Sequence, residues 1–435
     1  MSDDAPFDAS LVPPALLTID LEAIAAEFGT PLFVYDEGEL RRRAREYVEK
    51  FGVGCVTYAS KAFLCIAIAR LVHEEGLHLD CATGGELSVA LRAGVPGDRI
   101  VLHGNNKSSE ELAAAIESGI GRIALDSADE LDRLDALMGD RAGRADRTEP
   151  LDVLVRVTPG VEAHTHEYIE TGTEASKFGF TMTDGIALAA LGRVHATPGL
   201  RLAGLHCHIG SQIYRLDAYA RAIERLASLA ADAKAVHGCT LDELNLGGGL
   251  GARYLSDDPE LSVADYASTL NGAVERSWRS AGLGPSPRVV VEPGRSIVAP
   301  CAITVYRIGT VKEIPGVGTY AAVDGGMSDN PRPVLYGAGY EAYLPARIGD
   351  PRPRRGAVVG KHCEQGDVIV SDARFPAVVE VGDLLATPTT GAYGYSMASN
   401  YNKVPRPAVV FVRDGSPRLV VRRETTDDLV RLDVE

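Results

Sequence analysis

Residues 77–103 read LHLDCATGGELSVALRAGVPGDRIVLH, and this stretch contains the unit from which most of the chain is built. A short apolar strand is predicted at Leu77–Cys81, an amphipathic helix at Glu86–Ala93 and a second strand at Arg99–His103. Apolar residues three and four positions apart indicate the helix, whereas short apolar runs indicate the strands. Strands that alternate with helices are typical of parallel sheets in α/β folds.

The same unit recurs on both sides of this stretch. The other predicted strands are Cys55–Ser60, Arg122–Asp126, Leu151–Val157, Leu202–His208, Glu243–Gly247 and Arg288–Glu292. The other predicted helices include Leu64–Glu75, Ser109–Ser118, Ala128–Met138 and Ala218–His237, and Ser108–Glu111 resembles a capping box. Eight strands alternating with helices over about 240 residues predict a (β/α)₈ barrel, TIM-like in architecture.

An open, doubly wound sheet is the rival fold. That fold is expected to carry a nucleotide-binding fingerprint after its first strand, and none is present. Chemically reactive residues instead follow many different strands, and a barrel would bring all of these strand ends to one mouth. They are Lys61, Asp80, His208, Gly247–Gly249 and Glu292–Arg295.

After Pro300 the pattern changes to β-rich runs separated by Gly, Pro and Asp turns. The predicted strands are Val305–Ile308, Thr319–Val323, Ala357–Val359, Val368–Val370, Val378–Val381, Ala408–Val412 and Arg418–Arg422. Near the N-terminus, the strand-like Pro31–Tyr35 is expected to join them. We therefore predict a barrel domain at 38–296 and a β-sandwich or β-barrel domain formed by 1–37 and 297–435.

Composition excludes several classes of protein. Sixty acidic and 44 basic residues give a formal charge of −16, which argues against a nucleic-acid or anionic-membrane partner. The N-terminus has no apolar signal core, and no apolar run reaches the roughly 18 residues of a membrane span. Seven scattered cysteines without a CxxC motif indicate reduced thiols and a cytoplasmic protein.

Lys61 ends the first predicted barrel strand, within Tyr58-Ala59-Ser60-Lys61-Ala62. A lysine at a barrel mouth can form a Schiff base with a carbonyl group when desolvation lowers its pKa. An ordinary surface lysine at a strand end is the alternative, and Lys61 alone does not decide between the two.

Two loops follow the seventh and eighth predicted strands, where barrels often bind phosphate. Gly247-Gly248-Gly249-Leu250-Gly251 would let backbone amides close around a phosphate, although many glycine runs are only turns. In Glu292-Pro293-Gly294-Arg295, the carboxylate could face the pyridine nitrogen of pyridoxal phosphate. An ion pair between Glu292 and Arg295 is the alternative.

Histidines suggest a metal in two places, His206/His208 and His164/His166. Residues two apart in a strand share a face, so His206 and His208 are expected to point the same way. No third ligand has a suitable spacing in the sequence, so we expect no metal. A better interpretation stacks His208 on a cofactor ring and places Ser211 at its phosphate.

Taken together, these motifs resemble those of the alanine-racemase-fold, pyridoxal-phosphate-dependent decarboxylases. Their order and spacing match, and Ser176-Lys177-Phe178-Gly179 and His206–Gln212 belong to the same set. Ser328–Tyr336, Cys363–Asp367 and Gly391–Gly394 resemble the substrate loop, the Cys-Glu-x-x-Asp motif and the tyrosine loop of diaminopimelate decarboxylases. The resemblance extends over roughly residues 30–430.

The resemblance implies a role for each matching residue. Lys61 would hold pyridoxal phosphate, His208 would stack on its ring, and Glu292 would face the ring nitrogen. Asp80, Ser211, Gly248, Gly249, Gly294, Arg295 and Tyr393 complete the expected cofactor site. Arg295, Arg332, Tyr336, Glu364 and Tyr393 would hold the substrate, and Cys363 would donate a proton.

The implied reaction is decarboxylation of meso-diaminopimelate to L-lysine, the last step of lysine biosynthesis. The implied assembly is a homodimer with shared active sites, in which Lys177 faces Asp367 of the neighbouring chain. The sequence departs from the pattern at Thr83, Ser328, Lys361 and Gln365. The alternatives are another basic amino acid or carboxylated polyamine as substrate, an amino-acid racemase, or a non-catalytic regulatory homologue.

Overall fold

The structure is a computed structural model that describes residues 5–142, 149–161, 176–316 and 318–434. The chain forms two compact units. The barrel unit comprises Ala44–Gly251 and Leu261–Gly294, and the β unit comprises Met1–Arg43, Ala252–Glu260 and Arg295–Glu435. The domain boundaries that we predicted from the sequence, with the barrel domain at 38–296, remain a prediction.

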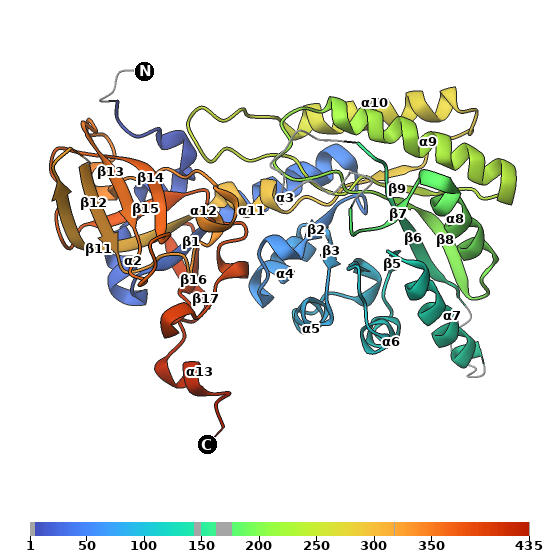
Figure 1. The fold of residues 1–435 in the computed structure, drawn as a ribbon, viewed down its shortest axis with the longest axis horizontal. Helices are drawn as coiled ribbons and strands as arrows, with labels where there is room; N and C mark the ends of the chain where they lie inside the picture. Colours follow the sequence, from blue (N-terminus) through green and yellow to red (C-terminus); the bar gives the residue numbers. More distant parts are fainter. Residues whose placement is uncertain (1–4, 143–148, 162–175, 317, 435) are drawn as a thin grey trace. The chain divides into compact units, whose positions relative to one another are not determined.

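Eight parallel strands form the barrel (Figure 1). In pairing order they are β2 (Thr57–Ala59), β3 (His78–Cys81), β4 (Ile100–Leu102), β5 (Arg122–Leu125), β6 (Leu151–Thr158), β8 (Leu200–His206), β9 (Glu243–Asn245) and β10 (Arg288–Val290). A parallel bridge between Val56 and Val291 brings the first strand to the last. A ninth, short strand, β7 (Phe180–Thr181), pairs with β6 outside this ring. The predicted barrel is confirmed, and its strands differ from the predicted ones by at most two residues at either end.

Helices surround the barrel strands, as Figure 1 shows. They are α4 (Ile66–Glu74), α5 (Gly84–Arg92), α6 (Ser109–Glu117), α7 (Ala128–Ala142), α8 (Ile186–Ala196), α9 (Asp217–His237) and α10 (Val263–Ser280). The capping box predicted at Ser108 is present, because the Ser108 side chain accepts the Glu111 amide and Glu111 accepts that of Ser108. Within the described ranges, no helix has the length and apolar character needed to span a membrane.

The β unit contains one mixed sheet of eight strands. Their order is β14 (Val368–Phe375), β13 (Arg354–Val359), β12 (Gly318–Val323), β11 (Ala302–Ile314), β1 (Leu32–Asp36), β16 (Ala408–Arg413) and β17 (Ser416–Val421), with β15 (Leu384–Pro388) also on β11. The prediction that the N-terminal strand joins this sheet is confirmed, since β1 pairs with both β11 and β16.

Short helices complete the β unit, and α3 (Glu37–Phe51) leads from it into the barrel unit. The short helices are α1 (Pro14–Thr18), α2 (Leu21–Phe28), α11 (Arg295–Val298), α12 (Arg332–Tyr336) and α13 (Thr426–Val430). Apolar side chains of α2, including Leu21 and Ile24, pack with Val34, Val305 and Val410 of the sheet in one buried cluster. Burial of this apolar face stabilises the unit.

One predicted strand is wrong. Val378–Val381 has the β-branched composition of a strand but forms a turn, with Val378 51% and Val381 64% exposed. Asp383 organises this turn, because its Oδ2 atom accepts a hydrogen bond from the Glu380 amide at 2.9 Å. The strand lies after the turn, at β15, where all five residues are buried. The amino-acid composition alone does not show that the strand is at β15 and not at Val378–Val381.

Candidate active site

Lys61 lies in the short 3-10 turn Ser60–Ala62, directly after β2. Its Nζ atom is 3.9 Å from Oδ2 of Asp80 in β3. The Lys61 side chain is 49% exposed, whereas that of Asp80 is 3% exposed. Burial raises the pKa of Asp80, against the opposing effect of His103 and Lys61. The amine is therefore accessible to a ligand and has a buried carboxyl group beside it.

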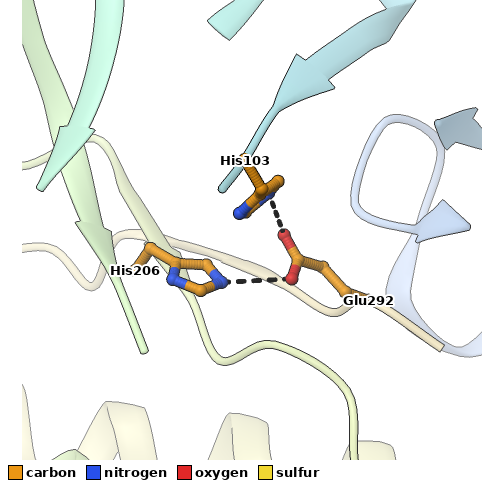
Figure 2. A group of neighbouring side chains, drawn as sticks. All are labelled: His103, His206 and Glu292. Carbon is orange, nitrogen blue, oxygen red and sulfur yellow. Dashed lines mark hydrogen bonds and ion pairs between the residues drawn. The ribbon is translucent and has the colours of Figure 1, made fainter. Parts of the chain in front are cut away.

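Glu292 follows β10 and is the centre of a buried group of polar side chains, shown in part in Figure 2. Its Oε1 atom is 2.9 Å from Nε2 of His103 and accepts a 2.8 Å hydrogen bond from Nδ2 of Asn245. Its Oε2 atom is 3.1 Å from Nε2 of His206. The ends of three barrel strands, β4, β8 and β9, thus supply the neighbours of Glu292, and Asp80 of β3 lies 3.9 Å from His103. We call Asp80, His103, His206, Asn245 and Glu292 the carboxylate cluster.

The charges in the carboxylate cluster follow from these contacts. Burial alone would raise the pKa of Glu292, but His103 and His206 outweigh it and hold that pKa well below its usual range. Burial lowers the pKa of His206 to about 4, and Glu292 offsets this only in part. For His103 the balance is reversed: burial lowers its pKa, but Glu292 and Asp80 outweigh burial and raise it. Glu292 is therefore an anion between a neutral His206 and a His103 whose protonated form its carboxyl neighbours favour.

The glycine loop after β9 lies close to neighbouring backbone. A Cβ atom on Gly248 would lie 2.3 Å from the carbonyl oxygen of Glu292. On Gly249, whose φ is +122°, it would lie 2.5 Å from the Tyr219 hydroxyl. Only glycine fits these two positions without a rearrangement. The Gly248 amide also donates to Nδ1 of His208 at 3.3 Å, so the loop is connected to the segment that follows β8.

A second group of polar side chains lies within the β unit. Arg332, at the start of α12, is 6% exposed, and its Nη1 atom donates to the Tyr340 hydroxyl. Nη1 of Arg295 donates to the Tyr254 hydroxyl at 2.8 Å. The guanidinium carbon of Arg295 also lies 4.7 Å from the centre of the Tyr393 ring. We call Tyr254, Arg295, Arg332, Tyr340 and Tyr393 the arginine cluster.

The arginine cluster is strongly cationic. Burial would raise the pKa of Tyr254, but Arg295 and Arg332 outweigh it and lower that pKa. Burial would lower the pKa of Arg332, but Tyr254 and Tyr340 outweigh it and raise that pKa. Within the described part of the chain, Arg332 forms no ion pair with a carboxylate. The cluster is thus suited to bind an anionic group, since guanidinium groups grip carboxylates in a bidentate manner.

The cysteine loop of the β unit is tied to the loop that precedes Arg332. Asp367 is buried, and its two oxygens accept hydrogen bonds from the Met327 amide at 2.6 Å and the His362 amide at 2.8 Å. A 2.9 Å hydrogen bond also joins Nε2 of His362 to the Ser328 hydroxyl. Cys363 and Glu364 are exposed beyond these contacts. Ser328, one of the positions at which the sequence departs from the family pattern, therefore has a structural role in this chain.

The structure also brings in residues that were not predicted as site residues. His103 and Asn245 belong to the carboxylate cluster, and Tyr254 and Tyr340 belong to the arginine cluster. His103 ends a predicted strand and could have been found from that position, whereas no sequence pattern indicates the two tyrosines. His164 and His166 lie outside the described residues.

The structure brings together three side chains of a kind that can bind metal ions. His103, His206 and Glu292 place one ligand atom each within 4.8 Å of one another. These three residues follow strands that are distant in the sequence, so their proximity could not be found from sequence spacing. Both oxygens of Glu292 already have hydrogen-bonding neighbours there.

Comparison with known proteins decides the family. Residues 37–299 match the pyridoxal binding domain of the pyridoxal-dependent decarboxylases. The chain is 50% identical over 425 residues to the diaminopimelate decarboxylase of Mycobacterium tuberculosis, covering 96% of this chain and 94% of the relative. The chain belongs to the diaminopimelate decarboxylase family. Its relative from Bacillus subtilis is 46% identical over 420 residues, again covering 96% and 94% of the two chains.

The fold supports the same assignment. The crystal structure of diaminopimelate decarboxylase from M. jannaschii in complex with L-lysine superposes with a TM-score of 0.86 at 31% identity. The match covers 96% of this chain and 94% of that chain. The predicted fold class, a barrel with a second β-rich unit, is therefore confirmed.

Pyridoxal phosphate is the cofactor of this family, and the residues of the barrel unit fit it. Lys61 offers an accessible amine, and Glu292 is a buried anion that suits a protonated ring nitrogen. Gly248 and Gly249 lie in the loop after β9, where barrels commonly hold a phosphate, and a side chain at either position would meet neighbouring atoms.

Proposed function

We propose that this protein decarboxylates meso-2,6-diaminopimelate to L-lysine and carbon dioxide, the last step of lysine biosynthesis. The observation that carries the proposal is Arg332, a buried guanidinium held by a tyrosine hydroxyl and without a carboxylate partner among the described residues. A substrate with a second, non-reacting carboxylate would fill that place. Family membership and the lysine complex of the M. jannaschii relative support the proposal.

The chain's residues divide the work between binding and proton transfer. When bound, pyridoxal phosphate supplies an electron sink for the electron pair that the departing carboxylate leaves behind. We assign Lys61 to hold the cofactor, Glu292 to the ring nitrogen and His208 to the ring face. Asp80, Ser211, Gly248, Gly249, Gly294, Arg295 and Tyr393 complete the proposed cofactor site.

Substrate recognition is assigned to five residues of the β unit. Arg332 and Arg295 would bind the distal carboxylate, and Glu364 would bind the distal ammonium group. Tyr336 and Tyr393 complete this set. L-Lysine lacks the second carboxylate, so it would leave the buried Arg332 guanidinium without a carboxylate partner and bind weakly. Cys363 would return a proton to the carbon atom that lost the carboxylate.

The assembly belongs to the same proposal. We place Cys363 and Glu364 of one chain in the active site of a second chain, in a homodimer with two shared sites. We retain the ion pair between Lys177 and Asp367 of the neighbouring chain as part of this proposal. Both oxygens of Asp367 already accept backbone amides, so the lysine would be an additional partner. We place the protein in the cytoplasm, which agrees with its seven free cysteines.

Carbon dioxide release from meso-diaminopimelate, compared with L-lysine, L-ornithine and L-arginine at equal concentrations, tests the proposal directly. We expect release from meso-diaminopimelate alone. Faster release from any of the other three amino acids would overturn the assignment. Racemisation without carbon dioxide release would indicate an amino-acid racemase. A chain that binds the cofactor but releases carbon dioxide from none of them would be a non-catalytic homologue.

A further inference from the structure

Glu292 is unusual in the number of donors directed at a single buried carboxylate. His103 and Asn245 approach one oxygen at 2.9 and 2.8 Å, and His206 approaches the other at 3.1 Å. All four side chains are at least nine-tenths buried. A buried carboxylate needs such partners, because burial without them favours the protonated form.

The three donors are not equivalent. Asn245 is uncharged, and burial keeps His206 neutral, with a pKa lowered to about 4. His103 has two carboxyl neighbours, since its Nε2 atom lies 2.9 Å from Glu292 and 3.9 Å from Asp80. Both neighbours raise the pKa of His103 against the effect of burial. Of the three donors, His103 is therefore the one that brings a positive charge to Glu292.

The other charged and titratable groups around Glu292 come from several strands. Arg156 of β6 is partly buried and contributes positive charge, as does Lys61 after β2. Cys207 and His208 follow β8, and burial keeps each uncharged by raising the pKa of Cys207 to about 12 and lowering that of His208. Arg156 lies 3.6 Å from Asp126, and Lys61 lies 3.9 Å from Asp80. His103 is in direct contact with the Glu292 carboxylate, at 2.9 Å.

We propose that His103 is a positioning residue that keeps Glu292 ionised and oriented, and so fixes the proton on the ring nitrogen of the bound cofactor. His103 does not contact the reacting atoms in this proposal, because it acts through Glu292. Asp80 approaches the same Nε2 atom of His103, at 3.9 Å, and lies near Lys61. His103 therefore lies beside both the carboxyl group near Lys61 and the carboxylate assigned to the ring nitrogen. The inference rests on the proposed role of Glu292.

The charge on His103 can be separated from its contact with Glu292 by two matched substitutions. In His103→Gln, the amide nitrogen replaces Nε2 as a donor but carries no charge. His206→Gln makes the same change at a histidine that is already neutral. Both are compared with the wild type in purified full-length protein. The dissociation constant of pyridoxal phosphate and the pH dependence of its visible absorbance band are measured, and activity is recorded beside them.

We expect His103→Gln to weaken cofactor binding by about 10- to 100-fold, as expected for loss of a charge-assisted contact. The pH dependence of the absorbance band should shift in the same variant. His206→Gln should lose at least about fivefold less affinity and keep the wild-type pH dependence, because a neutral donor replaces a neutral donor. Wild-type affinity and pH dependence in His103→Gln would overturn the inference, as would equal losses in the two variants.

Glu292→Gln distinguishes this inference from the role on which it rests. If His103 acts through the charge of Glu292, adding His103→Gln to Glu292→Gln should change cofactor affinity by less than about threefold. An independent, additional loss in the double variant would show that His103 acts otherwise. Wild-type cofactor binding in Glu292→Gln alone would overturn the proposed role of Glu292. An impaired Glu292→Gln beside a normal His103→Gln would overturn only the inference. His103→Gln alone leaves a buried Glu292 anion without its cationic neighbour. If that variant does not fold, the double variant still provides the test, because Glu292→Gln removes the buried anion.

Discussion

The carboxylate cluster of the barrel unit stabilises a buried negative charge, whereas the arginine cluster of the β unit contains buried positive charges. In the first, histidines and an asparagine stabilise a buried anion, Glu292. In the second, tyrosine rings and hydroxyls surround two guanidinium groups, Arg295 and Arg332. The anion has three donors within the protein, whereas Arg332 has no carboxylate among the described residues.

This difference indicates which kind of ligand group each cluster can bind. A buried anion with all its donors in place suits a cationic group of a ligand that stays bound, such as a protonated ring nitrogen. Among the described residues Arg332 is held by tyrosines, so it keeps most of its donors available for an anionic group that comes and goes. The barrel cluster therefore fits a resident cofactor, and the β-unit cluster fits a substrate carboxylate.

The largest expected effect concerns the barrel unit. Lys61→Ala should abolish both turnover and the visible absorbance of the protein–cofactor complex, because no other amine is assigned to hold the cofactor. The fold should persist, since the Lys61 side chain is 49% exposed. Absorbance spectra and carbon dioxide release measure the two losses. Lys234→Ala, an exposed lysine of α9, serves as the matched control and should match the wild type. Near-normal activity in Lys61→Ala would remove the basis for assigning the barrel cluster to the cofactor.

The next effect should separate the two clusters. Arg332→Ala should raise the KM for meso-diaminopimelate by about 10- to 100-fold, since a charge-assisted contact contributes about 1.5–3 kcal/mol. Its dissociation constant for pyridoxal phosphate should change by less than about threefold, because Arg332 is assigned to the substrate alone. Arg422→Ala, which removes an exposed arginine paired with Asp428, is the control. An unchanged KM would show that the distal carboxylate is recognised elsewhere.

The two clusters also differ in how far the sequence reveals them. Lys61, Asp80 and Glu292 follow strands, and strand ends were predictable from apolar periodicity, so these residues were found. Tyr254 and Tyr340 follow no regular pattern, and they meet Arg332 only because the chain folds back on itself. Residues 252–260 belong to the β unit although they lie between barrel elements in the sequence. Local sequence patterns do not encode such contacts.

Mistaken and missed features have the same physical origin. Val378–Val381 has the composition of a strand, but the Asp383 carboxylate accepts a hydrogen bond from the Glu380 amide and favours a turn there. His103 was placed correctly at a strand end, yet its importance depends on Glu292, which is distant in the sequence but 2.9 Å away in space. Periodicity therefore predicts the elements, and the pairing of polar groups between elements requires the structure.

A smaller effect tests the proposed assembly, in which each site combines a barrel unit with the cysteine loop of a second chain. Mixing Lys61→Ala with Cys363→Ala chains, each inactive alone, should restore roughly a quarter of wild-type activity. With random exchange about half of the dimers are mixed, and each mixed dimer has one intact site, by two-fold symmetry. Carbon dioxide release after subunit exchange gives the measurement, and mass spectrometry of differently tagged chains confirms the exchange. Mixed dimers without activity would show that each chain uses its own cysteine loop.

The smallest effect concerns the support of the arginine cluster. Ser328→Ala removes the hydroxyl that bonds His362 at 2.9 Å, and this bond connects the cysteine loop to the segment just before Arg332. One neutral hydrogen bond contributes about 0.5–1.5 kcal/mol, so the cysteine loop should open more often by roughly 2- to 10-fold. Asp367 continues to accept two amides and keeps the loop near its place. We therefore expect the KM to rise by less than about threefold, far less than in Arg332→Ala.

The rate at which iodoacetamide alkylates Cys363 measures this loosening in the purified protein. Cys363 is the exposed one of the seven cysteines in the single chain, and in the proposed dimer the reagent reaches it when the cysteine loop opens. Ser371→Ala, at an exposed serine of β14, is the matched control and should leave the alkylation rate unchanged. A KM increase in Ser328→Ala as large as that of Arg332→Ala would show that Arg332 depends on this hydrogen bond for its position. The arginine cluster would then have to include Ser328 and His362 in addition to its five residues.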